Sequence, residues 1–169
     1  MRETYRLKHI SSLGFTLIEL TLVIFFMALI AGLSTPFIMS TLDRMELQTS
    51  ARKVASTLRY ARSEAIASKK TVVFLGNLTQ NQYGVDQKYR NKKSKMTTLT
   101  DPVRLTHFRN KQENNNYGDS GEFTVTFFPQ GNSSGGLIGM DIKGPKNSKS
   151  YYAISIDPIT GSTKIKKTE

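Results

Sequence analysis

Hydrophobic residues change their spacing twice along the chain, and the first pattern is a continuous apolar segment. From Phe15 to Leu33 nearly every residue is apolar, and Glu19 is the one charged residue. A helix of this length spans about 28 Å, close to the hydrocarbon thickness of a bilayer. The pattern predicts a transmembrane helix over residues 15–36. Pro36, where the apolar segment fades, predicts a kink because proline removes a helical hydrogen bond.

The second pattern is a single apolar stripe at helical spacing. It predicts an amphipathic stem helix over residues 37–70, with its charged residues mostly off the stripe. The small residues in the stripe would let another element approach closely, and we expect that element to be the chain's own sheet. The stripe consists of Leu47, Ala51, Val54, Leu58, Ala61 and Ala65.

The third pattern begins after Lys70, where β-rich segments alternate with turn signals. One helix followed by such strands predicts an α+β fold, in which a mostly antiparallel β-sheet head over residues 71–169 packs on the helix. The strand candidates are Thr71–Leu75, Gln82–Gln87, Val103–Phe108, Glu122–Phe128, Gly136–Ile142, Tyr151–Asp157 and Ser162–Lys166. The turn signals are Gly76-Asn77, Asn114–Gly118, Pro129–Gly136, Gly144-Pro145 and Pro158–Gly161.

The residues before the apolar segment are basic, since Arg2, Arg6 and Lys8 outnumber Glu3. The positive-inside rule places this short segment in the cytoplasm and the C-terminal part of the chain across the membrane. A secretory signal peptide and a plain membrane anchor both fit these features. Neither explains Glu19, because a carboxylate in hydrocarbon costs several kcal/mol unless it is paired or neutralised.

The segment around Glu19 favours a third interpretation. Residues 14–20, Gly-Phe-Thr-Leu-Ile-Glu-Leu, resemble the processing motif of type IV prepilins and type II secretion pseudopilins. The resemblance implies that residues 1–14 are a leader, that a prepilin peptidase cuts after Gly14, and that the new N-terminal Phe15 is methylated. It also implies a single-pass protein of the inner membrane with its C-terminal head in the periplasm.

The chemistry of the motif suggests a role for Glu19 in assembly. Cleavage would create an α-amine on Phe15, one helical turn from the Glu19 carboxylate. In hydrocarbon each charge needs an opposite charge, which a staggered neighbouring subunit could supply and thereby set the axial register. Pairing within one chain, or a protonated Glu19 that packs without a partner, are the alternatives.

Later segments resemble the GspH/FimT family of minor pseudopilins and minor pilins. The resemblance implies a minor pseudopilin of the type II secretion system, which assembles with other major and minor pseudopilins into the periplasmic pseudopilus for protein export. A FimT-like minor pilin of a type IV pilus, with a role in DNA uptake, is the alternative. A membrane-anchored periplasmic enzyme or binding domain is a third option. The matching segments are Leu58–Ile66 with Val72-Val73, Phe127–Gly131 with Ser133–Gly136, and the hairpin Ile154–Ile165.

Charge adds a candidate binding surface. The chain has 24 Lys and Arg against 13 Asp and Glu, a formal net charge of +11, which favours acidic partners. Aromatic residues lie among the cations, so a nucleic-acid surface is conceivable, but we favour a solvated loop. The candidate residues are Lys88, Arg90, Lys92, Lys93, Lys95, Lys164, Lys166 and Lys167.

Catalytic chemistry is sparse in this sequence. There is no Cys, and the two histidines, His9 and His107, lie in different regions. No nucleophile-elbow motif accompanies His107, and no glycine-rich phosphate loop precedes a helix. We therefore predict no cofactor, no metal site and no enzymatic activity.

Overall fold

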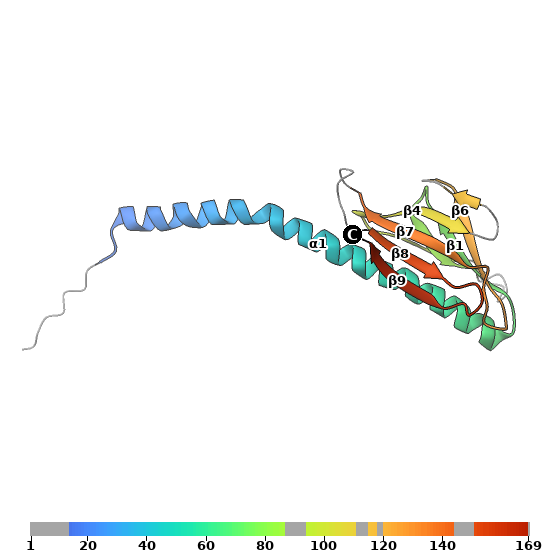
Figure 1. The fold of residues 1–169 in the computed structure, drawn as a ribbon. Coiled ribbons are helices and arrows are strands. Elements are labelled where there is room, and N and C mark those ends of the chain that lie inside the picture. Colours follow the sequence, from blue (N-terminus) through green and yellow to red (C-terminus); the bar gives the residue numbers. More distant parts are fainter. Residues whose placement is uncertain (1–13, 87–93, 111–114, 118–119, 144–150, 169) are drawn as a thin grey trace, which may run out of the picture. The chain divides into compact units, whose positions relative to one another are not determined.

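The computed structural model describes residues 14–86, 94–110, 115–117, 120–143 and 151–168; for residues 34–38, 40, 115–117 and 168 it describes the backbone alone. These residues form one long helix and nine strands (Figure 1). The chain divides into two compact units, residues 1–39 and residues 40–169. The division of the chain into leader, membrane helix, stem and head stays a prediction.

The helix, α1, spans Leu17–Ser68 and therefore belongs to both units. Its backbone is helical through Pro36, and the kink expected there stays a prediction. The helix ends where Lys69 adopts a positive φ of 54°, a left-handed conformation that stops helical hydrogen bonding. Among the described residues, no helical stretch combines the length and the mean hydropathy of a membrane span.

The strands form two antiparallel sheets. The four-stranded sheet has the order β3-β2-β1-β6, and the five-stranded sheet has the order β5-β4-β7-β8-β9. Consecutive strands β7, β8 and β9 are neighbours, whereas β1 pairs with the distant β6. The strands are β1 (Val72–Asn77), β2 (Gln82–Val85), β3 (Lys95–Thr98), β4 (Val103–Asn110), β5 (Asn115–Tyr117), β6 (Glu122–Phe127), β7 (Gly136–Ile142), β8 (Tyr151–Ile156) and β9 (Thr163–Thr168).

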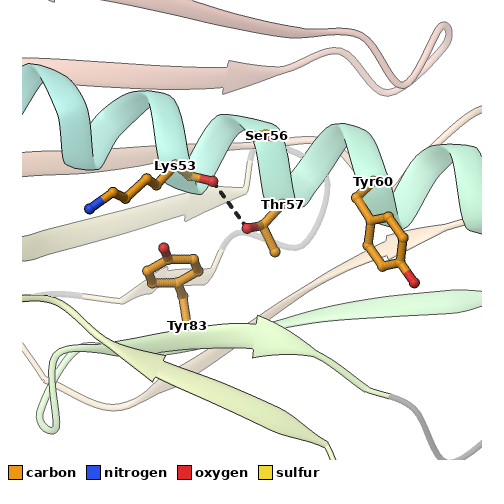
Figure 2. Close-up of a pocket in the computed structure, with 5 residues that line it drawn as sticks. All are labelled: Lys53, Ser56, Thr57, Tyr60 and Tyr83. Carbon is orange, nitrogen blue, oxygen red and sulfur yellow. Dashed lines mark hydrogen bonds between the residues drawn. The ribbon is translucent and has the colours of Figure 1, made fainter.

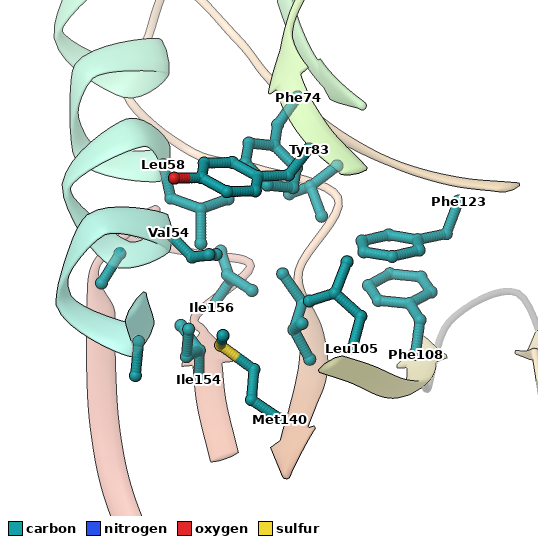
Figure 3. Packing of buried hydrophobic residues seen from close by; sticks show 14 of the residues in the cluster. Val54, Leu58, Phe74, Tyr83, Leu105, Phe108, Phe123, Met140, Ile154 and Ile156 are labelled. Carbon is teal, nitrogen blue, oxygen red and sulfur yellow. The ribbon is translucent and has the colours of Figure 1, made fainter. Parts of the chain in front are cut away.

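The core of residues 40–169 lies between the stem part of α1 and the two sheets. All six residues of the predicted stripe, from Leu47 to Ala65, are fully buried, as is Ala55. They share one apolar cluster with residues of both sheets, such as Phe74 and Met140 (Figure 3). The predicted α+β fold, a long helix packed on antiparallel strands, is therefore confirmed.

An aromatic pair joins the two sheets inside this core. The rings of Phe108 in β4 and Phe123 in β6 stack with centroids 4.4 Å apart (Figure 3). The Phe123 ring lies over its cross-strand partner Gly76, where an added Cβ would come within 2.2 Å of the ring. The absence of a side chain at Gly76 thus makes room for the contact between the sheets.

Asn81 makes a second, polar connection between the sheets. Its side-chain amide donates to the carbonyl of Val103 at 2.7 Å, and its side-chain oxygen accepts from the backbone N–H of Leu105 at 2.9 Å. Asn81 itself precedes β2 with a φ of 54°, which asparagine tolerates better than most residues. A side chain next to the four-stranded sheet therefore makes hydrogen bonds to backbone groups of β4, in the five-stranded sheet.

Three local expectations differ from the structure. Gly76-Asn77 is not a turn but the end of β1, where it pairs with β6. Residues 115–117, expected in a turn, form the short strand β5. The strand β3 was not expected, because its Lys-Met-Thr-Thr sequence lacks alternating apolar residues. In each case pairing with another strand overrides the local signal: β6 for Gly76-Asn77, β4 for residues 115–117 and β2 for β3.

Candidate functional site

The processing motif lies at the start of α1. Gly14 is exposed and outside any helix or strand, and no atom lies within 4 Å of where its Cβ would be. Thr16 caps the helix, since its Oγ1 accepts a hydrogen bond from the backbone N–H of Glu19 at 3.3 Å. The pattern Thr-x-x-Glu is that of a capping box, and this sequence signal could have predicted where the helix begins. Glu19 is an exposed residue in the first helical turn.

The apolar residues that follow Glu19 have no core of their own. In the unit formed by residues 1–39, large side chains such as those of Ile24, Phe25 and Leu29 are at least half exposed. Phe15, the predicted new N-terminus, is 82 % exposed. A contiguous apolar surface of this extent is typical of a segment that contacts lipid or another protein.

Hydrogen bonds join the turns of the head to one another and to the stem. Ser133 donates its backbone N–H to the carbonyl of Pro158 at 2.9 Å and its hydroxyl to the carbonyl of Asp157 at 3.0 Å. On the stem, Arg62 donates through Nε to the carbonyl of Gly131 at 3.0 Å. A Cβ at Gly161 would lie 2.3 Å from the same carbonyl oxygen. The absence of side chains at Gly131 and Gly161 thus allows the turns that contain them to approach the stem closely.

Asp157 shapes the turn between β8 and β9. Its carboxylate accepts hydrogen bonds from the backbone N–H groups of Ile159 and Thr160 and from the Thr160 hydroxyl, at 2.8–3.0 Å. The backbone N–H of Thr160, then its hydroxyl, hold the pKa of Asp157 below its ordinary 3.8, with a smaller contribution from the positive charge of Lys164. These bonds order the predicted terminal hairpin, which is confirmed.

A groove of about 340 Å³ lies between the stem and β2. Lys53, Ser56, Thr57 and Tyr60 line it from α1, and Tyr83 lines it from β2 (Figure 2). The Thr57 hydroxyl donates to the carbonyl of Lys53 at 3.0 Å, so it is already satisfied within the helix. Burial raises the pKa of the Tyr83 hydroxyl above its usual 10.0. The groove combines hydroxyl groups with one cation and has no acid beside a nucleophile.

The predicted basic patch is only partly described. Lys88, Arg90, Lys92 and Lys93 lie outside the described residues. Lys95 is exposed on β3, at the edge of the four-stranded sheet, and the three C-terminal lysines lie on β9, an edge of the other sheet.

The structure also separates the lysines of β9 from one another. Side chains alternate along a strand, so Lys164 and Lys166 project from one face and Lys167 from the opposite face. The predicted patch is therefore not one continuous surface of β9. Cross-strand register instead places Lys164 and Lys166 on the same face as cations of β4, a grouping the sequence did not reveal.

His107 takes part in a hydrogen-bonded pair. Its Nε2 shares a hydrogen bond of 2.9 Å with the Tyr151 hydroxyl, and its Nδ1 lies 3.1 Å from the Thr106 hydroxyl. In the part of the chain that the structure describes, no three His, Cys, Asp or Glu residues are grouped to hold a metal ion.

Comparison with known proteins identifies relatives of this chain. The family model described as "Type II transport protein GspH" matches residues 50–160, which include the later part of the stem and most of the head. The type II secretion system protein H of Xanthomonas campestris pv. campestris is 27 % identical over 151 residues, covering 89 % of this chain and 81 % of that protein.

Two solved structures share the fold. The minor pseudopilin EpsH from the type 2 secretion system of Vibrio cholerae matches with a TM-score of 0.56 at 15 % identity, over 72 % of this chain and 97 % of that one. The type IV minor pilin FimU of Pseudomonas aeruginosa matches with a TM-score of 0.52 at 15 % identity, over 73 % and 90 %.

The family match covers more than half of the chain and includes five of the six residues of the buried stripe, all but Leu47. The chain therefore belongs to the GspH family, the minor pseudopilins of the type II secretion system, whose members are structural and not enzymatic proteins.

Proposed function

We propose that this minor pseudopilin is made as a precursor, is cut between Gly14 and Phe15 by a prepilin peptidase, and is methylated on Phe15. The exposed, uncrowded position of Gly14 supports the proposal, because a peptidase must reach the carbonyl of this residue. The start of α1 at Leu17 supports it too, since cleavage would leave Phe15 and the cap residue Thr16 directly before the N-terminus of an intact helix.

The apolar half of α1 then anchors the protein in the inner membrane, with residues 71–169 in the periplasm. Its exposed apolar side chains support this placement, and so does the excess of cations before it. In the fibre the same side chains pack against the helices of other pseudopilins. This surface, which has no core within its own unit, is the observation that carries the proposal.

Glu19 sets the register of that packing. Glu19 is exposed in the first turn of α1, four residues after Phe15, so it is accessible to a neighbouring subunit. Within an apolar fibre core, the pair formed with a neighbour's amine is stable only when the two helices are correctly staggered. Removing one partner of such a pair costs about 3–5 kcal/mol, enough to exclude a subunit from the fibre.

The experiment compares Glu19→Val with Glu46→Val, the same change on the stem part of α1, in cells that carry the whole secretion system. Mass spectrometry of the wild-type protein should give an N-terminus at methylated Phe15. We expect both variants to be processed and inserted, and only Glu19→Val to be lost from sheared or cross-linked fibres. A mature N-terminus elsewhere would contradict the processing step, and normal incorporation of Glu19→Val would contradict the register role.

A type IV minor pilin is the second candidate, because the fold matches FimU nearly as well as EpsH. The two functions separate in a deletion strain. Loss of extracellular enzymes with intact pili would support the secretion role. Loss of pilus-dependent motility or DNA uptake with normal secretion would support the alternative.

A further inference from the structure

The outer face of the five-stranded sheet carries a set of cations that have no role in the proposed fibre assembly. Arg104 and Arg109 of β4, and Lys164 and Lys166 of β9, are all exposed. In this sheet the core-facing residues, such as Leu105, Ile138 and Ile154, occupy the alternate positions. We call the side opposite those residues the basic face.

Strand register shows how the basic face is built. Arg109 lies in a cross-strand row with Leu137, Ser155 and Lys164, and His107 lies in a row with Gly139, Ala153 and Lys166. Residues paired in register project from the same side of a sheet. The arginines of β4 and the lysines of β9 therefore form two columns, separated by three strand spacings or about 14 Å.

Two small residues and an aromatic pair lie in the floor between these columns. Gly139 and Ala153 contribute almost no side chain, and an added Cβ at Gly139 would lie 2.4 Å from the His107 ring. The ring of His107 is stacked near that of Tyr151, with centroids 5.6 Å apart, and both ring nitrogens have hydroxyl groups as neighbours. Rings that are held by stacking and hydrogen bonds need little further ordering when a partner binds, which lowers the entropic cost of association.

One acid interrupts the cations. Asp141 lies in register between Arg104 and Tyr151. Burial is the main cause that raises the pKa of the Tyr151 hydroxyl; Arg109 lowers this pKa and Asp141 raises it, so both charges act at the middle of the face. The charge pattern is therefore mixed, with two positive columns and an acid at one end of the floor between them.

We propose that the basic face docks an acidic segment of a partner protein, whose carboxylates meet the columns of Arg104–Arg109 and Lys164–Lys166 while one of its cations meets Asp141. Charge complementarity of this kind steers association and selects among partners. A nucleic acid fits the face less well, because its uniform row of phosphates offers nothing to pair with Asp141. The docking surface lies in the head and does not require Glu19, so it can fail without affecting the proposed fibre assembly.

The test titrates the full chain, in a neutral detergent, with three probes. They are a poly-glutamate peptide, a peptide of glutamate blocks interrupted by single lysines, and an oligothymidylate of matched charge. In Lys164→Glu/Lys166→Glu we expect the affinity for both peptides to fall about tenfold or more. The matched control Lys53→Glu/Lys70→Glu makes the same charge change at exposed residues elsewhere and should change affinity far less. An equal loss in the control would mean that net charge alone is measured, and would overturn the proposal.

Asp141→Asn tests the mixed pattern. We expect it to strengthen binding of poly-glutamate, by removing a repulsion, and to weaken binding of the lysine-containing peptide, by removing an ion pair. Equal strengthening of both peptides would remove the argument for a protein partner. Oligothymidylate that binds more tightly than either peptide, and is lost in the lysine double variant, would assign the face to nucleic acid instead.

Discussion

The two halves of α1 are parts of one helix, yet their apolar residues have different surroundings. In residues 40–68, six regularly spaced apolar residues are fully buried under two sheets. In residues 15–33, apolar residues surround the helix and are exposed within their own unit. A narrow stripe can be covered by one neighbour, whereas a helix that is apolar all round needs an apolar environment on every side. The exposed apolar residues of the first half therefore suit the membrane and fibre environment that we propose, whereas the second half packs on its own head.

The largest expected effect comes from the same substitution in the two halves. Leu58→Ala removes a fully buried side chain and should lower the free energy of unfolding of the head by about 2–5 kcal/mol. Leu22→Ala removes a side chain that is 54 % exposed and should leave that unfolding unchanged. Chemical denaturation followed by circular dichroism of the full chain in detergent measures both. Equal effects would mean that the two halves share a single core.

A smaller effect should follow from enlarging an alanine. Ala61→Leu places extra atoms where the stem meets the sheets and should destabilise the head by about 1–3 kcal/mol, because the site is fully buried in a packed core. Ala28→Leu adds the same atoms at an exposed site in the apolar half and should not change the midpoint. The same denaturation assay decides, and an unchanged midpoint for Ala61→Leu would show that the stem packs loosely.

The smallest effect is a pH dependence at the stem–sheet groove. Because burial raises the pKa of Tyr83, the folded head holds this proton more tightly than the unfolded chain does. The resulting stability is complete below the ordinary pKa of 10.0 and is lost as the pH rises through the higher folded value. Tyr83→Phe should reduce this alkaline loss, although Tyr151 also contributes to it. Tyr60→Phe, on the opposite wall of the groove, is the control, and identical alkaline curves for wild type and Tyr83→Phe would refute the assignment.

Local patterns predicted most of the secondary structure. The six residues of the stripe from Leu47 to Ala65 are buried as predicted, and all seven proposed strands begin and end within two residues of their observed bounds, since alternation and helical spacing reflect burial directly. The first strand extends two residues beyond its predicted end, through Gly76-Asn77, because β6 pairs with these residues. The strand β3 had no apolar alternation to detect, since it is a mostly exposed edge strand.

The candidate sites were predictable to different degrees. Gly14, Phe15 and Glu19 lie within six consecutive residues, so their chemistry could be argued from spacing alone. The basic surface could not, because neighbours such as Lys166 and Lys167 point to opposite faces, while Lys164 shares its face with the distant Arg109. The hydrogen bond from Arg62 to the carbonyl of Gly131 could not be predicted either, since the two residues are far apart in the chain.

The amino-acid sequence by itself determined the order of parts: a short basic start, an apolar helix with one acid, an amphipathic stem, and a β-rich head. Each part is encoded by residues that are close together in the chain, so the spacing of their apolar side chains can be recognised without the tertiary structure. The tertiary structure alone decided that the head has two sheets, that Asn81 and the Phe108–Phe123 pair join them, and that cations of β4 and β9 share one face. These features depend on pairing between distant strands, and such pairing is selected by the packing of the whole core.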